Sequence, residues 1–506
     1  MNVSSQNQPN ILFILTDMQR ADTIAALGNP VIKTPNLDRL VREGTSFTNA
    51  FTPSPVCCPA RACFQYGLYP GKTGLADNGR WMEDNGNSYP AVLKNAGYRT
   101  KSVGKCHFSP GGKEVMRGFD ERLTQEEVQS DIDQDDYLGW LDKNKLDTFE
   151  AHGARGEMYY IPQVATHRDG AHPTGWIGDR SIEYMEDASK GDQPWMLYSS
   201  FIHPHPPFAP PKPWHKLYRT HEMPLPMVPE DSEALYTWIN YRQNRYKWRD
   251  NGIDKNLLRT MKAYYYAAIS FVDYQVGRMM ESLEKMGQLD NTLILFSSDH
   301  GEYLGDYNCF GKRSYHDCSS KVPFLVRYPE RFKANEVCQV PVSLVDIFPT
   351  FAAAAGADVE GVELDGVDVA AIASGDSDRD MVFSHFGSSL NDKSGHAIYT
   401  VVTKTHKYVY STGDGKAWLF DRFVDPLESR SIANTPSGKK LSVQMKQVLL
   451  THLKEQGVNY AYEETEKGLD WAKIDPADLT YLEDPDAGLL VQDYHTYELN
   501  LPEYTD

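Results

Sequence analysis

A cysteine, a proline and an arginine stand at a Cys-x-Pro-x-Arg spacing in the first part of the chain. They are Cys57, Pro59 and Arg61, within Pro-Ser-Pro-Val-Cys-Cys-Pro-Ala-Arg. Proline is favoured in the first turn of a helix, so we expect Pro59 to open one, with Cys57 just ahead of it, where free backbone N–H groups attract sulfate or phosphate. Arg61 would add a planar set of donors suited to an oxyanion. The spacing predicts a nucleophile that faces an anion; the alternative is a buried structural cysteine beside an ordinary helix start.

Two acidic residues follow strand-like apolar runs. Asp17 comes after Ile-Leu-Phe-Ile-Leu-Thr, and Asp299 comes after Leu-Ile-Leu-Phe-Ser-Ser, with His300 next to it. Ligands of open parallel sheets bind beyond the carboxyl ends of the strands. Carboxylates placed there can hold a hard divalent cation, which prefers oxygen ligands and polarises a bound anionic ester. Each aspartate alone could simply cap a loop, but the equivalent placement of the pair predicts a metal site.

Basic and imidazole side chains are expected at the same edge of the sheet. Lys105 and His107 end another strand, in Gly-Lys-Cys-His. His205 lies in His-Pro-His-Pro-Pro-Phe after a further strand, where prolines restrict the backbone and so suit an imidazole that transfers a proton. Lys312 follows Asp299 closely enough to place a second ammonium on the leaving-group side. Asn78, in Ala-Asp-Asn-Gly, either reaches substrate hydroxyls or belongs to an ordinary turn.

The elements that must position these residues alternate between strand and helix patterns. This order is typical of an α/β fold with a mainly parallel sheet covered by helices. The stretches 125–180 and 206–255 are irregular and rich in aromatic residues, so we expect loops there. Buried strands are predicted at 11–16, 98–103, 195–200, 292–297 and 323–327, and helices at 34–44, 257–286 and 346–356.

The pattern of predicted secondary structure changes near residue 375. Short β-rich runs at 398–403 and 408–410 are followed by Thr-Gly-Asp-Gly, which is a hairpin signal. A helix is predicted at 442–456, and the acidic tail 470–506 looks irregular. We therefore expect a large domain at 1–375 and a smaller antiparallel one at 376–506.

Composition excludes some classes of function. The chain has 506 residues, 41% of them hydrophobic, and its 51 Lys and Arg against 70 Asp and Glu give a formal charge of -19. Such an acidic chain disfavours binding to nucleic acid or to an anionic membrane. Seven cysteines are an odd number without a regular framework, as expected for mostly reduced thiols. No membrane-spanning run or signal-peptide core is seen, so we expect a cytoplasmic protein, or a periplasmic or secreted one if an export signal was removed.

Taken together, the motifs resemble those of the type I sulfatases of the alkaline phosphatase superfamily, whose Cys-x-Pro-x-Arg signature matches Cys57, Pro59 and Arg61. The resemblance runs from Asn10 to about Gly356 and continues into the C-terminal part. It implies an alkaline-phosphatase-like mainly parallel sheet flanked by helices, with a smaller C-terminal α+β domain. The other matching segments are Thr16-Asp-Met-Gln-Arg20, Thr34-Pro-Asn-Leu-Asp-Arg39, Gly104-Lys-Cys-His107, Pro204-His-Pro-Pro-Phe208, Ser298-Asp-His-Gly301, Gly311-Lys312 and Leu419-Phe-Asp-Arg-Phe-Val-Asp-Pro426.

The resemblance also implies roles for the site residues. A maturation enzyme would oxidise Cys57 to formylglycine (3-oxoalanine), whose hydrate offers one hydroxyl to attack sulfur and a second that allows sulfate to leave. Calcium, with magnesium as the alternative, would be held by Asp17, Asp299, His300 and the converted Cys57. His205 would protonate the leaving oxygen, with Lys312 as its competitor. The residues that would neutralise the sulfate oxygens are Arg61, Lys105, His107 and Lys312. Those that would contact the substrate are Asn78, Lys105, His205 and Lys312.

Three positions depart from the family pattern. Met18 stands where many relatives have Asp or Gln, and a thioether is a poor ligand for a hard cation, so Gln19 substitutes or the site has one protein ligand fewer. Ala60 replaces a common serine, and Cys106 replaces the usual tryptophan. Neither of these two changes removes a charged group from the expected chemistry.

The expected activity is hydrolysis of sulfate monoesters, with a carbohydrate as the expected substrate. A wall of aromatic and arginine side chains could stack on a sugar, or could instead pack against the domain as a lid. The first rival function is a formylglycine-dependent phosphonate monoester or phosphodiester hydrolase, and the second is an inactive protein that binds sulfated glycans. The residues of the expected wall are Trp214, Tyr218, Tyr236, Trp238, Tyr241, Arg242, Arg245, Tyr246, Trp248 and Arg249.

Overall fold

The centre of the molecule is an eight-stranded sheet with the strand order β5-β4-β6-β1-β7-β8-β2-β9. The computed structural model describes residues 8–79, 81–108, 112–127, 131–155, 158–248, 254–387 and 395–480. Strands β5, β4, β6, β1 and β7 run parallel, whereas β8 runs antiparallel to both of its neighbours. The expected mainly parallel α/β sheet is confirmed. Its strands are β1 (Asn10–Asp17), β2 (Thr45–Phe47), β4 (Arg99–Gly104), β5 (Glu121–Thr124), β6 (Trp195–Pro204), β7 (Thr292–Ser298), β8 (Phe324–Arg327) and β9 (Glu336–Cys338).

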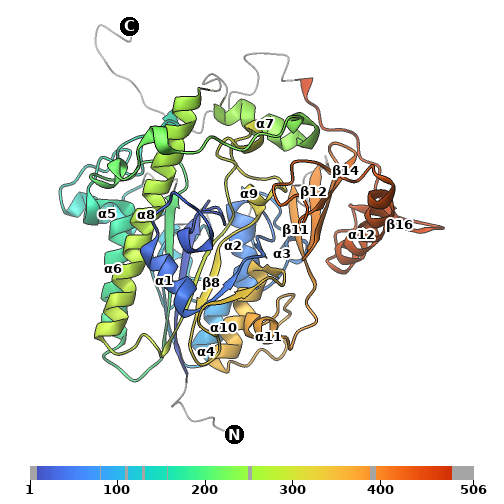
Figure 1. Cartoon of the computed structure of the whole chain (residues 1–506). Coiled ribbons are helices and arrows are strands. Elements are labelled where there is room, and N and C mark those ends of the chain that lie inside the picture. Colours follow the sequence, from blue (N-terminus) through green and yellow to red (C-terminus); the bar gives the residue numbers. More distant parts are fainter. Residues whose placement is uncertain are drawn as a thin grey trace.

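Helices cover both faces of this sheet (Figure 1). Alternate residues of β1 point to opposite faces, so Phe13 and Leu15 belong to one apolar core and Leu12 and Ile14 to the other. A strand that is buried on both faces needs apolar residues at consecutive positions, which explains the continuous apolar run. The first core is closed by α2 (Cys57–Tyr66), α4 (Tyr89–Asn95), α10 (Ile347–Ala355) and α11 (Val369–Ser374), and the second by α1 (Pro35–Glu43), α5 (Asp136–Lys143), α6 (Pro173–Ala188) and α8 (Lys255–Lys285).

The helix that carries the cysteine signature starts earlier than predicted. It begins at Cys57 itself, after Val56 in extended conformation, so Pro59 lies inside the first turn instead of opening it. This is tolerated because the N–H groups of the first turn have no partner within a helix, so a proline there loses no hydrogen bond. Cys57 is consequently fixed by the helix and not by a preceding loop.

The prediction of loops at 125–180 and 206–255 is partly wrong. These stretches contain α5, the first half of α6 and the whole of α7 (Trp238–Trp248). The buried residues of α6 include Thr174, Gly175 and Ser181, so small and polar side chains face the sheet and β6 and the apolar periodicity of the helix is weak. Packing against the domain stabilises this helix more than its own sequence pattern does.

The C-terminal part is built on an antiparallel sheet of four strands, at the right of Figure 1. One face packs on α12 (Pro436–Glu455), and the other face shares an apolar core with Val56 and Tyr303 of the large domain. The predicted hairpin turn at 412–415 is confirmed, whereas α12 starts earlier than predicted because the Thr435 side chain caps it. The sheet consists of β11 (Met381–Gly387), β12 (Ala397–Thr403), β13 (His406–Ser411) and β14 (Lys416–Asp421).

Short elements complete the described chain, and most of the acidic tail lies outside the described residues. No helix among the described residues combines the length and the apolarity that a bilayer crossing requires. The short strands and α-helices among them are β3 (Ala50–Phe51), β10 (Val342–Ser343), β15 (Tyr462–Thr465), β16 (Gly468–Trp471), α3 (Pro70–Thr73) and α9 (Asp317–Ser320).

Candidate active site

Four neighbouring parallel strands bring the predicted side chains to one edge of the sheet. Asp17 is the last residue of β1, and Asp299 follows β7; Lys105 follows β4 and His205 follows β6. In the sheet these strands stand in the order β4-β6-β1-β7. Gly104 allows the turn into Lys105, because it has a φ of +99° and a Cβ there would come within 2.0 Å of the Ser200 carbonyl oxygen. Strand order therefore explains how residues distant in sequence meet.

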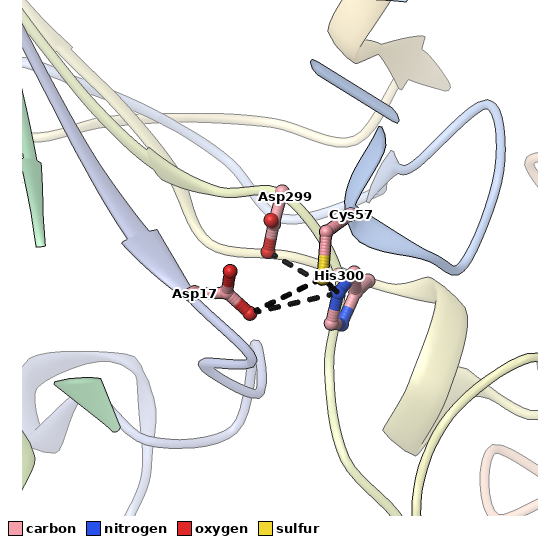
Figure 2. A group of neighbouring side chains, drawn as sticks. All are labelled: Asp17, Cys57, Asp299 and His300. Atoms are coloured by element: carbon pink, nitrogen blue, oxygen red, sulfur yellow. Dashed lines mark hydrogen bonds and ion pairs between the residues drawn. The ribbon is translucent and has the colours of Figure 1, made fainter. Parts of the chain in front are cut away.

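A buried group of four side chains could hold a metal ion. Asp17, Cys57, Asp299 and His300 each direct one ligand atom inward, and these atoms all lie within 4.8 Å of one another (Figure 2). His300 Nε2 lies 3.3 Å from Cys57 Sγ, 3.5 Å from Asp299 Oδ1 and 3.7 Å from Asp17 Oδ1. Two carboxylates and an imidazole suit a divalent cation, whereas the sulfur is a soft donor. An oxygen in place of this sulfur would complete a set for a hard ion.

Arg61 joins the two aspartates of this group. Its Nε donates to Asp299 Oδ2 at 2.9 Å and its Nη2 donates to Asp17 Oδ2 at 3.1 Å, while the side chain is only 1% exposed. Nη1 donates to the Lys105 carbonyl oxygen at 2.7 Å and also contacts Tyr198 and Ser200. Among the described residues, the guanidinium is thus engaged by protein acceptors on every nitrogen. This geometry fits an orienting role under the two carboxylates.

Two lysines place positive charge around the Cys57 side chain. Lys105 Nζ donates to Asp17 Oδ2 at 2.6 Å, and Lys312 Nζ donates to Cys57 Sγ at 2.9 Å. Burial and Asp17 act to raise the pKa of the Cys57 thiol, but Lys105, Lys312 and His300 hold this pKa well below its usual value. The pocket therefore stabilises negative charge at the position from which a nucleophile would act.

His205 and Lys312 form one hydrogen-bonded pair beside Cys57. His205 Nδ1 lies 2.7 Å from the carbonyl oxygen of Pro206, which can only accept, so Nδ1 carries the hydrogen. Its Nε2 lies 3.3 Å from Lys312 Nζ and accepts from it. Burial lowers the pKa of His205 to about 4, which keeps this imidazole neutral. Lys312 consequently bears the proton of the pair in this structure.

His107 and Asn78 lie next to the first turn of α2. The half-buried His107 ring stands 5.5 Å from the Trp81 ring, and its backbone N–H donates to Glu126 Oε1 at 3.1 Å. Asn78 Oδ1 accepts from the backbone N–H of Cys58 at 3.0 Å. Asn78 therefore supports the helix start that carries Cys57.

Met18 contributes its backbone to the site. Its N–H donates to Asp299 Oδ1 at 3.2 Å, its φ is +64°, and its carbonyl oxygen accepts from the Tyr265 hydroxyl at 2.6 Å. Gln19 Nε2 donates to Thr23 Oγ1, and Gln19 Oε1 is buried without a hydrogen-bond partner among the residues that the structure describes. The group of four acidic, cysteine and histidine ligands is complete without the Met18 side chain.

Two residues that hold the lysines of this site were not predicted from the sequence. Glu127 Oε2 accepts from Lys105 Nζ at 2.7 Å, and Glu127 Oε1 lies 3.4 Å from His205 Nδ1. Gln243 on α7 binds both backbone groups of Lys312: its Oε1 accepts from the Lys312 N–H at 3.0 Å, and its Nε2 donates to the Lys312 carbonyl oxygen. Neither residue belongs to a recognisable motif. Both lie in the stretches that the sequence marks only as aromatic-rich and irregular.

Most of the expected aromatic wall is packed against the domain. Trp214 lies 5.1 Å from Phe271 of α8 between ring centroids, and the Tyr236 hydroxyl donates to the Tyr307 carbonyl oxygen at 2.6 Å. Asp414, in the turn between β13 and β14, accepts from the Trp238 N–H at 3.0 Å and so fixes the start of α7. For these residues the packing alternative is the better description. The side chains of Tyr246 and Trp248, and Arg249 as a whole, lie outside the described part.

Comparison with known proteins agrees with this geometry. A family model described as sulfatase matches residues 9–357, and a model described as N-sulphoglucosamine sulphohydrolase, C-terminal, matches residues 305–456. An arylsulfatase of Clostridium perfringens is 30% identical over 484 residues, which cover 90% of this chain and 96% of that protein. An N-acetylglucosamine-6-O-sulfatase of Bacteroides thetaiotaomicron is 24% identical over 87% of this chain and 86% of that protein.

A solved structure shows the same architecture. The crystal structure of a phosphonate monoester hydrolase of Agrobacterium radiobacter superposes with a TM-score of 0.77 and 25% identity, over 92% of this chain and 99% of that one. The family match spans more than half of the chain and contains the buried group of Asp17, Cys57, Asp299 and His300. The chain belongs to the type I sulfatase family of the alkaline phosphatase superfamily and is a sulfuric ester hydrolase.

Proposed function

We propose that this enzyme hydrolyses sulfate monoesters of carbohydrates, with Cys57 converted to formylglycine and calcium bound by Asp17, Asp299 and His300. The observation that carries the proposal is the buried meeting of Cys57, two carboxylates, His300 and Lys312 at the ends of neighbouring strands. Support for a sugar comes from the similarity to an N-acetylglucosamine-6-O-sulfatase and to the C-terminal model of N-sulphoglucosamine sulphohydrolase. The complete set of charged side chains argues against an inactive sulfated-glycan binding protein.

The residues present fit both groups that the family implies. Two carboxylates and an imidazole match a divalent cation, but the Cys57 sulfur matches it poorly. Conversion of Cys57 would supply hydroxyl groups, which are harder ligands than a thiol and are oxygen nucleophiles for an ester. The cation would supply a Lewis acid that draws negative charge from the sulfate oxygens.

The side chains of this chain then orient the ester and move a proton. Arg61 holds Asp17 and Asp299 in a fixed relative orientation, and Lys105 and Lys312 stabilise the negative charge that develops on the sulfuryl oxygens. Lys312 and His205 form a hydrogen-bonded pair that carries a proton, and the leaving oxygen of the ester would need a proton at this place. Because neutral His205 accepts from Lys312, the pair can deliver a proton while His205 stays uncharged.

We expect His205→Ala to lower kcat/KM by about a hundredfold or more for alkyl and sugar sulfates, which have poor leaving groups that need a proton. The loss should be much smaller for 4-nitrophenyl sulfate, because nitrophenolate leaves without one. Steady-state kinetics on a series of sulfate esters with graded leaving groups measures this dependence. His221→Ala, which removes an exposed imidazole, is the matched control. An equal loss on all the esters would show that His205 does not serve proton transfer.

Paired substrates test the reaction itself. The 4-nitrophenyl esters of sulfate, of a phosphonate monoester and of a phosphodiester share a leaving group, so their kcat/KM values compare only the transferred group. We expect the sulfate to be preferred, and we expect a strong chelator to remove activity that added Ca²⁺ restores. The similarity to a phosphonate monoester hydrolase keeps that activity as the second candidate. A clear preference for the phosphonate would replace the sulfatase proposal with it.

A further inference from the structure

Glu127 brings a third carboxylate into a site that has to bind an anion. Its side chain is only 10% exposed and lies between Lys105, Arg155 and His205. The distances are 2.7 Å from Oε2 to Lys105 Nζ, 3.2 Å from Oε1 to Arg155 Nη2 and 3.4 Å from Oε1 to His205 Nδ1. Asp17 and Asp299 belong to the metal group, whereas Glu127 lies outside it. The role of this extra negative charge needs its own explanation.

Lys105 connects Glu127 to the reacting centre. Its ammonium donates to Asp17 at 2.6 Å and to Glu127 at 2.7 Å, and the lysine side chain is fully buried. One positive charge is therefore shared between two carboxylates. The two carboxylates largely balance the charge of the Lys105 ammonium. A negatively charged substrate oxygen that approaches Lys105 therefore gains less electrostatic energy than it would beside an unpaired ammonium.

This balance matters because candidate substrates differ in charge. A sulfate monoester carries one negative charge, as do a phosphonate monoester and a phosphodiester. A phosphate monoester carries close to two above its second pKa of about 6, and so does the inorganic sulfate released by the reaction. A nearby buried carboxylate penalises the dianion more than the monoanion, because the repulsion scales with the charge of the ligand.

We propose that Glu127 is a specificity-determining residue that makes the site favour monoanionic esters over dianionic ones and weakens the hold on the dianionic product. The proposal rests on the proposed hydrolase function and adds to it the charge class of the substrate. Glu127 also contacts His205, so its removal affects proton delivery as well. Substrates that share one good leaving group separate the two effects, because the change in proton delivery is then common to them.

The test is the Glu127→Gln variant, which keeps the shape of the side chain and removes its charge. At about pH 8, where 4-nitrophenyl phosphate is a dianion, the ratio of kcat/KM for this phosphate to that for 4-nitrophenyl sulfate should rise about tenfold. The ratio for the monoanionic 4-nitrophenyl phenylphosphonate to the sulfate should stay within about twofold, because its charge equals that of the sulfate. An unchanged phosphate ratio, or an equal rise in both ratios, would overturn the proposal.

Two further variants test whether a change in the fold, and not the loss of charge at Glu127, alters the substrate preference. Glu127→Asp keeps the charge and should retain the wild-type ratios even if its overall rate falls. Glu121→Gln removes a carboxylate from the same part of the chain, where it pairs with Arg99 and Lys101 at the start of β5, and should leave the ratios unchanged. A raised phosphate ratio in either variant would show that disturbance of the fold, and not the charge of Glu127, sets the preference.

Binding measurements test the proposal independently of turnover. Calorimetry on the metal-loaded enzyme should show that Glu127→Gln tightens the binding of inorganic sulfate about tenfold more than that of monoanionic methyl sulfate. Parallel changes for the two ions would refute the role of Glu127. If the wild-type enzyme fails to hydrolyse 4-nitrophenyl sulfate, the proposed function fails, while the two dissociation constants still decide whether Glu127 discriminates by charge.

Discussion

Replacing Cys57 by alanine should lower kcat/KM for sulfate esters by about ten-thousandfold or more, because the variant has no group that can become the nucleophile. The side chain is buried between Asp17, His300 and Lys312, and alanine removes only its sulfur atom. The midpoint of thermal unfolding should therefore change little. Steady-state kinetics and a melting curve on the same preparations measure the two quantities.

Serine at this position gives a sharper result. A serine hydroxyl can attack sulfur, but it has no second hydroxyl through which the enzyme could release sulfate. Cys57→Ser should therefore show at most a single burst of alcohol release, with a stable gain in mass on the peptide that contains residue 57. Cys338→Ser, at the distant strand β9, is the control and should turn over normally. Repeated turnover by Cys57→Ser, or by wild-type enzyme whose Cys57 is an unmodified thiol, would refute the formylglycine mechanism.

The second large effect is expected for Arg61→Met. Methionine fills much of the same space but leaves Asp17 and Asp299 without the cation that they share. Loss of one partner from a buried ion pair costs about 3–5 kcal/mol, so the metal-free variant should unfold at a clearly lower temperature or denaturant concentration. Activity should fall about a thousandfold or more, because the two carboxylates lose their fixed orientation.

The matched control and the metal content complete this experiment. Arg278→Met breaks the half-exposed pair with Asp179 and should change the free energy of unfolding by about 1 kcal/mol or less. Added Ca²⁺ should recover part of the lost stability of Arg61→Met, since the proposed cation site includes the same two carboxylates. Wild-type stability and activity in Arg61→Met would mean that the two carboxylates do not depend on their shared guanidinium.

The sheet and the metal group could be predicted because each depends on short, local signals. An apolar run such as the one before Asp17 is required by a strand that is buried on both faces, and a polar residue at its end must lie at the ligand edge. The helix that carries Cys57 is indicated by Pro59, although it begins at Cys57 and not at the proline. These features need no knowledge of distant packing.

The missed features depend on contacts between segments that carry no pattern of their own. Glu127 reaches Lys105 and His205 only because a loop folds over the ends of β4 and β6. Gln243 reaches Lys312 only because α7 lies against the segment that follows β7. Helix α6 buries small residues, which hide its helical period. The expected sulfate contact of Arg61 also overlooked Asp17 and Asp299, whose need for a shared cation is visible only once the strand ends meet.

The anchoring of α7 connects the C-terminal sheet to the candidate active site. Asp414 fixes the N-terminus of this helix from the C-terminal sheet, and Gln243 passes that constraint to the main chain of Lys312. A protein cut after residue 375 would keep Asp17, Cys57, Asp299 and His300 but would lose Asp414, which anchors the helix that holds the Lys312 main chain. Loss of the C-terminal sheet is therefore expected to loosen Lys312 through α7.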